Sequence, residues 1–133
     1  MFTVIVEKAA SFNSKEIFTL ERGDKSASVT HEVVADFEEK AKTATKKFSL
    51  TDSKKIFNAF AALDFSKIFK ESGELIGCDG WTLRCTLRNG TNELAVELWC
   101  PCEDVSKPET TKLIKACELV ESFFQKENLC NYI

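Results

Sequence analysis

The six cysteines and the single histidine are the residues of this chain with the widest chemical range. Cys100-Pro101-Cys102, taken with Cys78 and Cys85, suggests a zinc site, since thiolates are common zinc ligands. Zinc knuckles space their ligands as C-x(2–4)-C, so C-P-C is too tight and a second knuckle is missing. A redox role for C-P-C is weaker still, and the simplest interpretation is a strand that ends at proline. We therefore expect no metal and no cofactor.

Acid–base and nucleophilic chemistry have little support in the sequence. His31 is the only histidine, and a strand pattern places it on the same face as Val29 and Val33, which favours a structural role. Glu71, Glu74 and Asp79 are close in sequence, but their spacing matches no calcium loop. The chain contains neither G-x-S-x-G nor the glycine-rich motifs of phosphate-binding loops. We expect a protein that is not an enzyme.

The clearest local structure is residues 79–100, DGWTLRCTLRNGTNELAVELWC. Apolar residues alternate with polar ones on both sides of Asn89-Gly90, a strong hairpin signal. A two-residue turn at Asn89-Gly90 would place Cys85 opposite Leu94, Leu83 opposite Val96 and Trp81 opposite Leu98. All apolar side chains then share one face.

The other face of this hairpin is the candidate binding surface. It presents Arg84 and Arg88 near Glu93 and Glu97, together with Trp99. Cross-strand ion pairs alone would make an ordinary solvated face, but a large indole among charges indicates either a covering element or a partner. Glu103 and Asp104 follow the strand and extend the acidic rim. The expected partner contacts are Glu93, Glu97, Trp99, Glu103, Asp104, Arg84 and Arg88.

The remaining sequence predicts further strands and three helical segments. Residues 2–6 form a first strand, and segments 16–22 and 26–34 flank a turn at Gly23-Asp24 that would pair Leu20 with Ala27 and Phe18 with Val29. Asp36 and Glu39 resemble a capping box. Residues 36–50 as a whole fit either a helix or a strand, and a strand is favoured over 43–50.

The helical segments have recognisable starts. Thr51 is the expected N-cap of a helix with Ile56, Phe57, Phe60 and Leu63 on its apolar stripe, and Asp64 caps a short turn after it. Ser106 and Pro108 begin a last helix, whose apolar positions include Leu113, Cys117, Val120 and Phe124. The order predicts one α+β domain, residues 1–133, with a mainly antiparallel sheet of about five to six strands and helices on one face.

Charge and hydropathy narrow the possible partners. The net charge is −3, and it is uneven: residues 1–70 carry +2 and residues 71–133 carry −5. An acidic half disfavours nucleic acid as a partner and suits a basic protein. No apolar stretch is long enough to span a bilayer, and the N-terminal residues lack a signal-peptide pattern, so we expect a cytoplasmic protein without a membrane role.

The second half of the chain resembles a known group of proteins. Asp79-Gly80-Trp81, a second strand ending in Trp99-Cys100-Pro101 and an amphipathic helix follow one another over about residues 55–125. This order is similar to bacterial immunity proteins encoded beside polymorphic toxins, such as those of contact-dependent growth inhibition. The resemblance implies a cytoplasmic, non-enzymatic inhibitor, a monomer when free, that binds a cognate toxin domain and covers its active site. Toxic nucleases are commonly basic, which agrees with the acidic half.

Two other functions remain open at this stage. The first is a small-ligand-binding or enzymatic domain with a cavity between helices and sheet, lined by some of the eleven phenylalanines. A deep polar-floored pocket with shifted titrating groups would favour it. The second is a structural adaptor with no toxin involved.

Overall fold

A computed structural model of the 133-residue chain describes residues 1–10, 14–35, 42–71, 81–99 and 106–131. The strands are β1 (Phe2–Ala10), β2 (Ser14–Arg22), β3 (Ala27–Ala35), β4 (Lys42–Phe48), β5 (Trp81–Asn89) and β6 (Asn92–Trp99). The helices are α1 (Leu50–Ala61), α2 (Phe65–Glu71) and α3 (Pro108–Asn131). The predicted order of elements is confirmed, including a strand in the ambiguous segment after residue 42. The capping box predicted at residues 36–39 lies outside the described residues.

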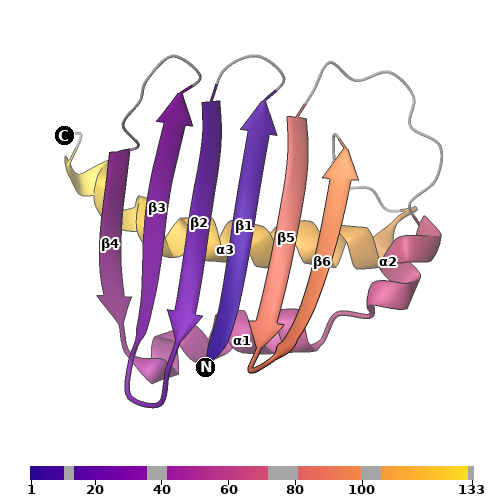
Figure 1. Ribbon diagram of the computed structural model, residues 1–133, viewed down its shortest axis with the longest axis horizontal. Coiled ribbons are helices and arrows are strands. Elements are labelled where there is room, and N and C mark those ends of the chain that lie inside the picture. Colours follow the sequence, from indigo (N-terminus) through magenta and orange to yellow (C-terminus); the bar gives the residue numbers. More distant parts are fainter. Residues whose placement is uncertain (11–13, 36–41, 72–80, 100–105, 132–133) are drawn as a thin grey trace.

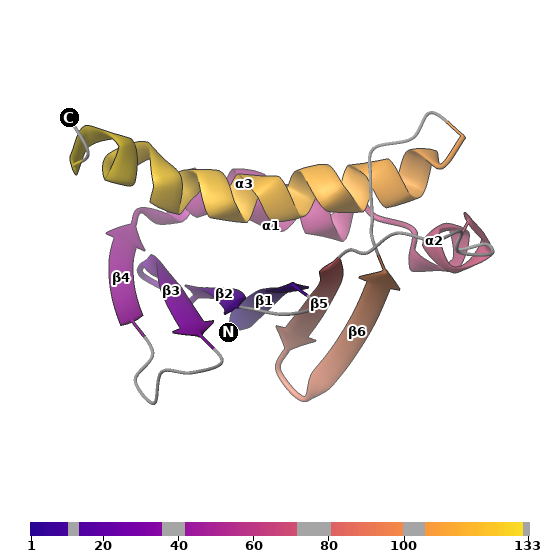
Figure 2. The ribbon, with the colours of Figure 1, turned by 90° about the horizontal axis from the view of Figure 1, so that it is seen from above.

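The strands form one open antiparallel sheet in the order β4-β3-β2-β1-β5-β6. Helices α1 and α3 lie on one face of this sheet, and Figures 1 and 2 show the other face without a helical layer. The predicted α+β class is therefore confirmed. β1 lies in the middle, because it pairs with β2 on one side and with β5 on the other.

The β5–β6 hairpin differs from the prediction by two residues in register. Its loop is Gly90-Thr91, with Asn89 opposite Asn92, Cys85 opposite Val96 and Leu83 opposite Leu98. Gly90 has a φ of 62°, a conformation that glycine adopts without the steric cost of a side chain. β1 pairs as far as Asn89, which keeps this residue in the strand. The predicted register was wrong, but a two-residue shift keeps every side chain on its predicted face.

The β2–β3 hairpin shows the same kind of correction. Leu20 pairs with Val29 and Phe18 with His31, not with Ala27 and Val29 as predicted. The loop has four residues in place of two, and the N–H of Gly23 donates to the carbonyl oxygen of Ser26 at 3.0 Å. The longer loop again preserves the faces, and Phe18 gains a stacked contact with His31 at 4.4 Å between ring centroids.

The start of α1 differs from the prediction by two residues. Ser49, and not Thr51, is its N-cap, and its side-chain oxygen accepts a hydrogen bond from the N–H of Asp52. Asp52 lies in the first turn as predicted. Asp64 caps α2 as predicted, because its Oδ1 accepts the N–H groups of Ser66 and Lys67.

The start of α3 is stabilised by a residue that was not predicted for this role. Pro108 is its first residue, and Glu71 at the end of α2 accepts the N–H groups of Glu109 and Thr110, each at 2.9 Å. Ser106, the predicted N-cap, precedes Pro108 by two positions. A carboxylate near the helix N-terminus also meets the positive end of the helix dipole.

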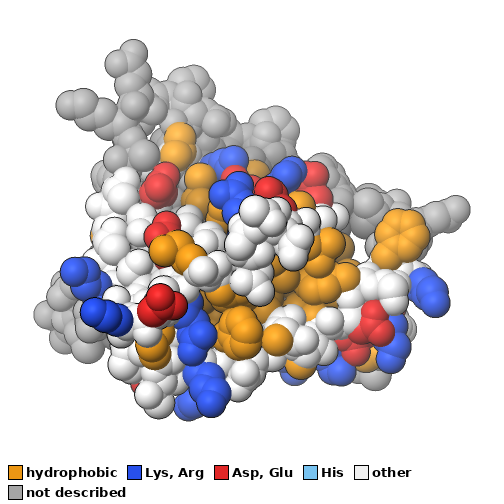
Figure 3. Space-filling view, turned by 60° about the horizontal axis from the view of Figure 1, so that its bottom comes forward, with side chains coloured by type: hydrophobic (Ala, Val, Ile, Leu, Met, Phe, Trp, Pro, Cys, Tyr) orange, Lys and Arg blue, Asp and Glu red, His pale blue; other side chains and the backbone are white. Residues whose placement is uncertain are grey.

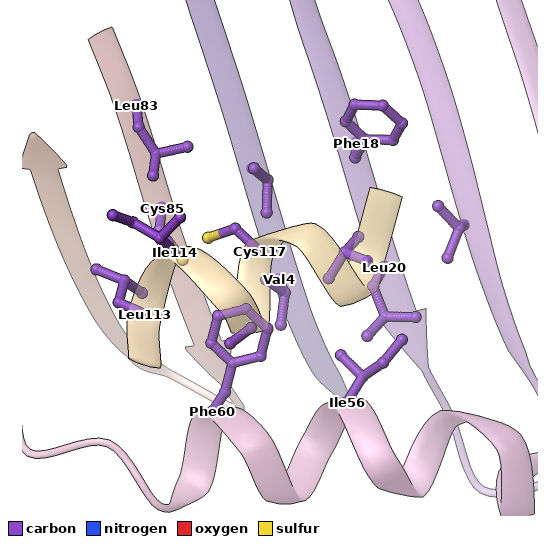
Figure 4. Packing of buried hydrophobic residues seen from close by; sticks show 14 of the residues in the cluster. Val4, Phe18, Leu20, Ile56, Phe60, Leu83, Cys85, Leu113, Ile114 and Cys117 are labelled. Carbon is purple, nitrogen blue, oxygen red and sulfur yellow. The ribbon is translucent and has the colours of Figure 1, made fainter. Parts of the chain in front are cut away.

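The core lies between the helices and the inner face of the sheet (Figure 4). Alternate residues of the strands point into it, and the stripes of α1 and α3 meet them. Its largest fully buried side chains are Phe18, Leu20, Ile56, Ile68, Leu83, Leu113, Val4, Val6, Val29, Val120, Cys85 and Cys117. This packing supports the strands from one side, and the described helices leave the other face of the sheet uncovered.

Candidate binding surface

The candidate surface is the outer face of the sheet, which α1 and α3 do not cover (Figure 2). Because side chains alternate along a strand, the residues between the core positions point outward. Cross-strand neighbours on this face follow from the pairing register. One row across the sheet is Thr45, Thr30, Thr19, Ile5, Thr86 and Ala95; the next is Thr43, Glu32, Ile17, Glu7, Arg84 and Glu97.

A chain of ion pairs crosses four strands on this face. Glu7 of β1 is at its centre: one carboxylate oxygen lies 3.0 Å from Nζ of Lys15, and the other lies 3.6 Å from Nε of Arg84. Arg84 also has its Nη1 4.0 Å from Glu97. The side chain of Glu7 is only 19% exposed, whereas those of Arg84 and Glu97 are half or more exposed. The arginine is therefore held between two acids and still accessible to a partner.

A second ion pair lies two rows nearer to the β5–β6 turn, beyond the row of Thr86 and Ala95. Nε of Arg88 is 3.5 Å from a carboxylate oxygen of Glu93, and both side chains are 52% exposed. Between the two ion-paired rows is a hollow of about 400 Å³. Its lining residues are Ile5, Glu7, Lys15, Arg84, Thr86, Arg88 and Glu93. Exposed pairs of this kind contribute little to stability, on the order of 0–1 kcal/mol, which leaves them free to exchange partners.

The structure brings together four of the predicted contact residues. Arg84, Arg88, Glu93 and Glu97 lie on one face as directly opposite pairs, a closer arrangement than the predicted register would give. Trp99 lies in β6 opposite Thr82, and its side chain is not described.

The charge of the described part of this surface differs from the expectation of a simply acidic patch. Two arginines balance the two glutamates of β6. Glu103 and Asp104, the other acidic residues predicted for this surface, lie outside the described residues. The described surface therefore offers charges of both signs at fixed spacing.

Three residues of the hollow lie outside the predicted hairpin, namely Ile5, Glu7 and Lys15. They come from β1 and β2, and β1 reaches the hairpin only through its pairing with β5. The alternation of Val4 and Val6 with Ile5 and Glu7 was a usable signal for the outward face. The sequence did not indicate that β1 pairs with β5.

The acidic residues at the junction of α2 and α3 have structural roles. Burial alone would raise the pKa of Glu71, but the hydrogen bonds from the N–H groups of Glu109 and Thr110 outweigh it and hold this pKa below its usual value. The pKa of Glu109 is also lowered, mainly by Lys112, whose Nζ lies 2.9 Å away. The pKa of Asp64 is lowered by the Ser66 hydroxyl first. The ionised forms of Asp64 and Glu71 cap α2 and α3, and Glu109 accepts a hydrogen bond from the N–H of Asp64.

His31 and the two described cysteines lie on the inner side of the sheet, away from the outer surface. Nε2 of His31 is 3.8 Å from a carboxylate oxygen of Glu16, and the ring stacks on Phe18. Cys85 of β5 and Cys117 of α3 are buried free thiols that lie against each other in the core (Figure 4). Contact with Cys85 and burial raise the pKa of Cys117 well above its ordinary value.

In the ranges that the structure describes, no three or more histidine, cysteine or acidic side chains form a group able to hold an ion. The motif Cys100-Pro101-Cys102 and Cys78 lie outside those ranges, so the expectation of no zinc at these thiols remains a prediction. Likewise, Glu74 and Asp79 are not described.

A second hollow lies on the outer side of the helical layer, between α1 and α3. Its volume is about 710 Å³, and it is lined by Ala59, Ala62, Leu63, Lys112, Lys115, Ala116, Glu118, Leu119 and Ser122. Figure 3 views the end of the molecule where α1 lies and shows hydrophobic side chains exposed among charged ones. The predicted phenylalanine-lined cavity had been expected elsewhere, between helices and sheet, where Phe18 and Phe60 are 1% and 2% exposed within the packed core.

Comparison with family models, with curated proteins and with solved structures found no match to this chain. Among the described residues, no helix has the length and apolar character to cross a membrane.

Proposed function

We propose that this protein is an immunity protein, an inhibitor that binds a cognate toxin domain and covers its active site. The observation that carries the proposal is the outer face of β5 and β6, where Arg84–Glu97 and Arg88–Glu93 form exposed ion pairs on strands that are packed against the core. Because these strands pack against the core, their backbone loses little conformational freedom on binding. The same residues belong to the segment that resembles immunity proteins.

In the proposed complex, the ion pairs within the hairpin are replaced by ion pairs with the toxin. Glu93 and Glu97, at the edge of the sheet, would pair with the cationic active site of a toxic nuclease, while Arg84 and Arg88 fix the register by meeting acidic groups of the toxin. Opposite charges aligned across an interface speed association and disfavour wrong partners. Trp99, Glu103 and Asp104 complete the proposed contact set. The charge of −5 on residues 71–133 would attract a basic toxin at long range.

The proposal places the protein in the cytoplasm, where an immunity protein meets a toxin that has entered the cell. It assigns no catalytic step, cofactor or metal to the chain. It also excludes nucleic acid and membrane as partners of this surface. The toxin's identity and activity follow from the neighbouring gene and not from this chain.

The test begins with the polypeptide encoded directly upstream. Its C-terminal domain is purified, and its association with the full chain is measured by stopped-flow fluorescence at several salt concentrations. A Glu93→Lys/Glu97→Lys variant should associate at least about tenfold more slowly at low salt, because it presents repulsive charges to a basic surface. A Glu118→Lys variant is the control, since this exposed glutamate lies on α3, on the other side of the sheet.

The two possible failures of this test have different meanings. If the wild-type protein forms no complex with the upstream domain and does not protect cells that express it, the immunity proposal is wrong. If a complex forms but the Glu93→Lys/Glu97→Lys variant associates as fast as the wild-type protein, the toxin binds another face.

A small-ligand-binding domain is the second candidate, and the apolar hollow between α1 and α3 favours it. Its alanine and leucine lining suits a hydrophobic ligand, and Lys115 at its border could meet an acidic head group. Titration with a fatty acid, followed by calorimetry, tests this alternative. Binding that is lost in Leu119→Lys and kept in Leu94→Lys would support it.

A further inference from the structure

The two edges of the sheet are built differently. The β4 edge carries Lys42, Lys46 and Lys47, and lysines on an edge strand discourage pairing with another chain. The β6 edge is eight residues long and contains neither lysine nor proline. Among the described strands, only β5 pairs with β6. β6 therefore has the features of an edge that another strand can extend.

An apolar socket lies beside this edge. Figures 1 and 2 show α2 beyond β6, at the border of the sheet, so the helical layer reaches past the last strand. Between them is a hollow of about 210 Å³, lined by Phe65, Ile68, Phe69, Ala95, Val96, Glu97 and Leu98. Leu94 of the same strand, further from α2, is 42% exposed. One edge thus carries both an apolar hollow and an exposed leucine.

We propose that β6 is a homodimer interface, at which two copies of the chain pair antiparallel about a two-fold axis through Val96. The pairing would join two six-stranded sheets into one continuous sheet. This replaces the monomer that the sequence alone led us to expect. It does not depend on the immunity function, because the outer face that would bind a toxin stays exposed in the dimer.

The pairing pattern of the hairpin decides which residues can bond to a second strand. In a two-residue hairpin, the residues flanking the loop bond to each other, and every second residue after them does so too. Asn92 flanks the loop, so Glu93, Ala95 and Glu97 direct their backbone N–H and carbonyl groups away from β5. A second strand must therefore bond to these alternate residues.

Charge then selects the register. An axis through Ala95 would place Glu93 of each copy directly opposite the partner's Glu97, and like charges in that position are destabilising. An axis through Val96 places Glu97 opposite the partner's Ala95 instead. It also keeps Leu94, Val96 and Leu98 of both copies on the same inner face.

The same register brings the exposed leucine to the socket. With the axis at Val96, Leu94 of one copy lies opposite the partner's Leu98, which lines the hollow under α2. The partner's α2 then covers Leu94, and symmetry repeats the contact at the other end. Each dimer would bury two leucines that are partly exposed in a single chain, one in each socket.

The experiment is sedimentation equilibrium of the full chain over a wide concentration range, with a reducing agent to keep the cysteines as thiols. The wild-type chain should show a monomer–dimer equilibrium. Leu94→Lys should raise the dissociation constant about a hundredfold, since two leucine contacts are lost per dimer and each is worth about a factor of ten. Phe69→Ser, at a position 81% exposed, should weaken the dimer without altering the sheet.

Leu119→Lys is the matched control, because Leu119 is 37% exposed but lies on α3, away from β6. It should leave the dissociation constant unchanged. Hydrogen exchange provides a second readout: the amides of Glu93, Ala95 and Glu97 should become protected as concentration rises.

Three results would overturn the proposal. The first is a monomer at every concentration that solubility allows. The second is a dimer that Leu119→Lys dissociates and Leu94→Lys does not. The third is full protection of the β6 amides in the monomer, which would mean that another segment of the same chain occupies the edge.

Discussion

The ion pair between Lys8 and Glu121 allows a quantitative test of how α3 is held on the sheet. Nζ of Lys8, on the inner face of β1, lies 2.6 Å from a carboxylate oxygen of Glu121 on α3. The two side chains are 32% and 10% exposed. The glutamate is therefore almost enclosed, whereas the lysine still reaches solvent. Lys8→Met removes the cation and leaves the enclosed carboxylate without it.

The expected cost of this substitution follows from the burial of the pair. Breaking a fully buried pair costs about 3–5 kcal/mol, and exposed pairs contribute about 0–1 kcal/mol. Since Lys8 is one-third exposed, we expect Lys8→Met to lower the free energy of unfolding by about 2 kcal/mol. For a domain of this size, the midpoint of urea unfolding, followed by circular dichroism, should fall by about 1 M.

The double variant distinguishes the lost pair from a general effect of substitution. Glu121→Met alone should cost less than Lys8→Met, because the lysine left behind can extend to water. Lys8→Met/Glu121→Met should recover most of the stability lost in Lys8→Met, since no enclosed charge remains. If the double variant loses the sum of the two single losses, the residues are not coupled and the reasoning is wrong.

Three further predictions follow from the core and the helix junction. The pKa of Glu71 is lowered in the folded protein, so its ionised form contributes stability above pH 4.5, and this contribution is lost as the pH falls through the folded-state pKa. In thermal unfolding, Glu71→Gln should be less stable than the wild-type protein at neutral pH and should lose less stability on acidification. An equal loss of stability on acidification in both proteins would contradict this. Alkylation with iodoacetamide, mapped by mass spectrometry, should label Cys85 and Cys117 only after denaturant is added, because burial and the raised pKa of Cys117 suppress its thiolate. Leu113→Ala should lower the free energy of unfolding in urea by about 3 kcal/mol, because Leu113 is fully buried. Leu119→Ala, at an exposed position of the same helix, should change this free energy little.

The sequence predicted the faces of the strands better than their register. In both hairpins the inward and outward residues agree with the alternation, although the paired residues differ by two positions. The alternation predicts the face of each side chain, because the face depends only on whether the residue is at an odd or an even position of the strand. The loop depends on competing local geometries, such as the hydrogen bond within Gly23–Ser26, which alternation does not contain.

Long-range partners account for what the sequence left out. The outward position of Glu7 follows from the alternation of β1, but its contact with Arg84 depends on the pairing of β1 with β5. The cap of α3 by Glu71 similarly joins residues almost forty positions apart. The residues next to α3 in the sequence indicated Ser106 as a cap and contained no sign of Glu71. The β5–β6 half of the candidate surface was thus predictable, and the β1–β2 half was not.

The central place of β1 in the sheet has a consequence for biosynthesis. Val4 pairs with Leu20 on one side and with Leu87 on the other. As the chain leaves the ribosome, the first four strands can form a meander, but one side of β1 stays without its partner until β5 has been made. During that interval the nascent chain carries an incomplete sheet edge, which is open to wrong pairing. Helix α3, which follows β6 in the chain, then closes the core over both halves.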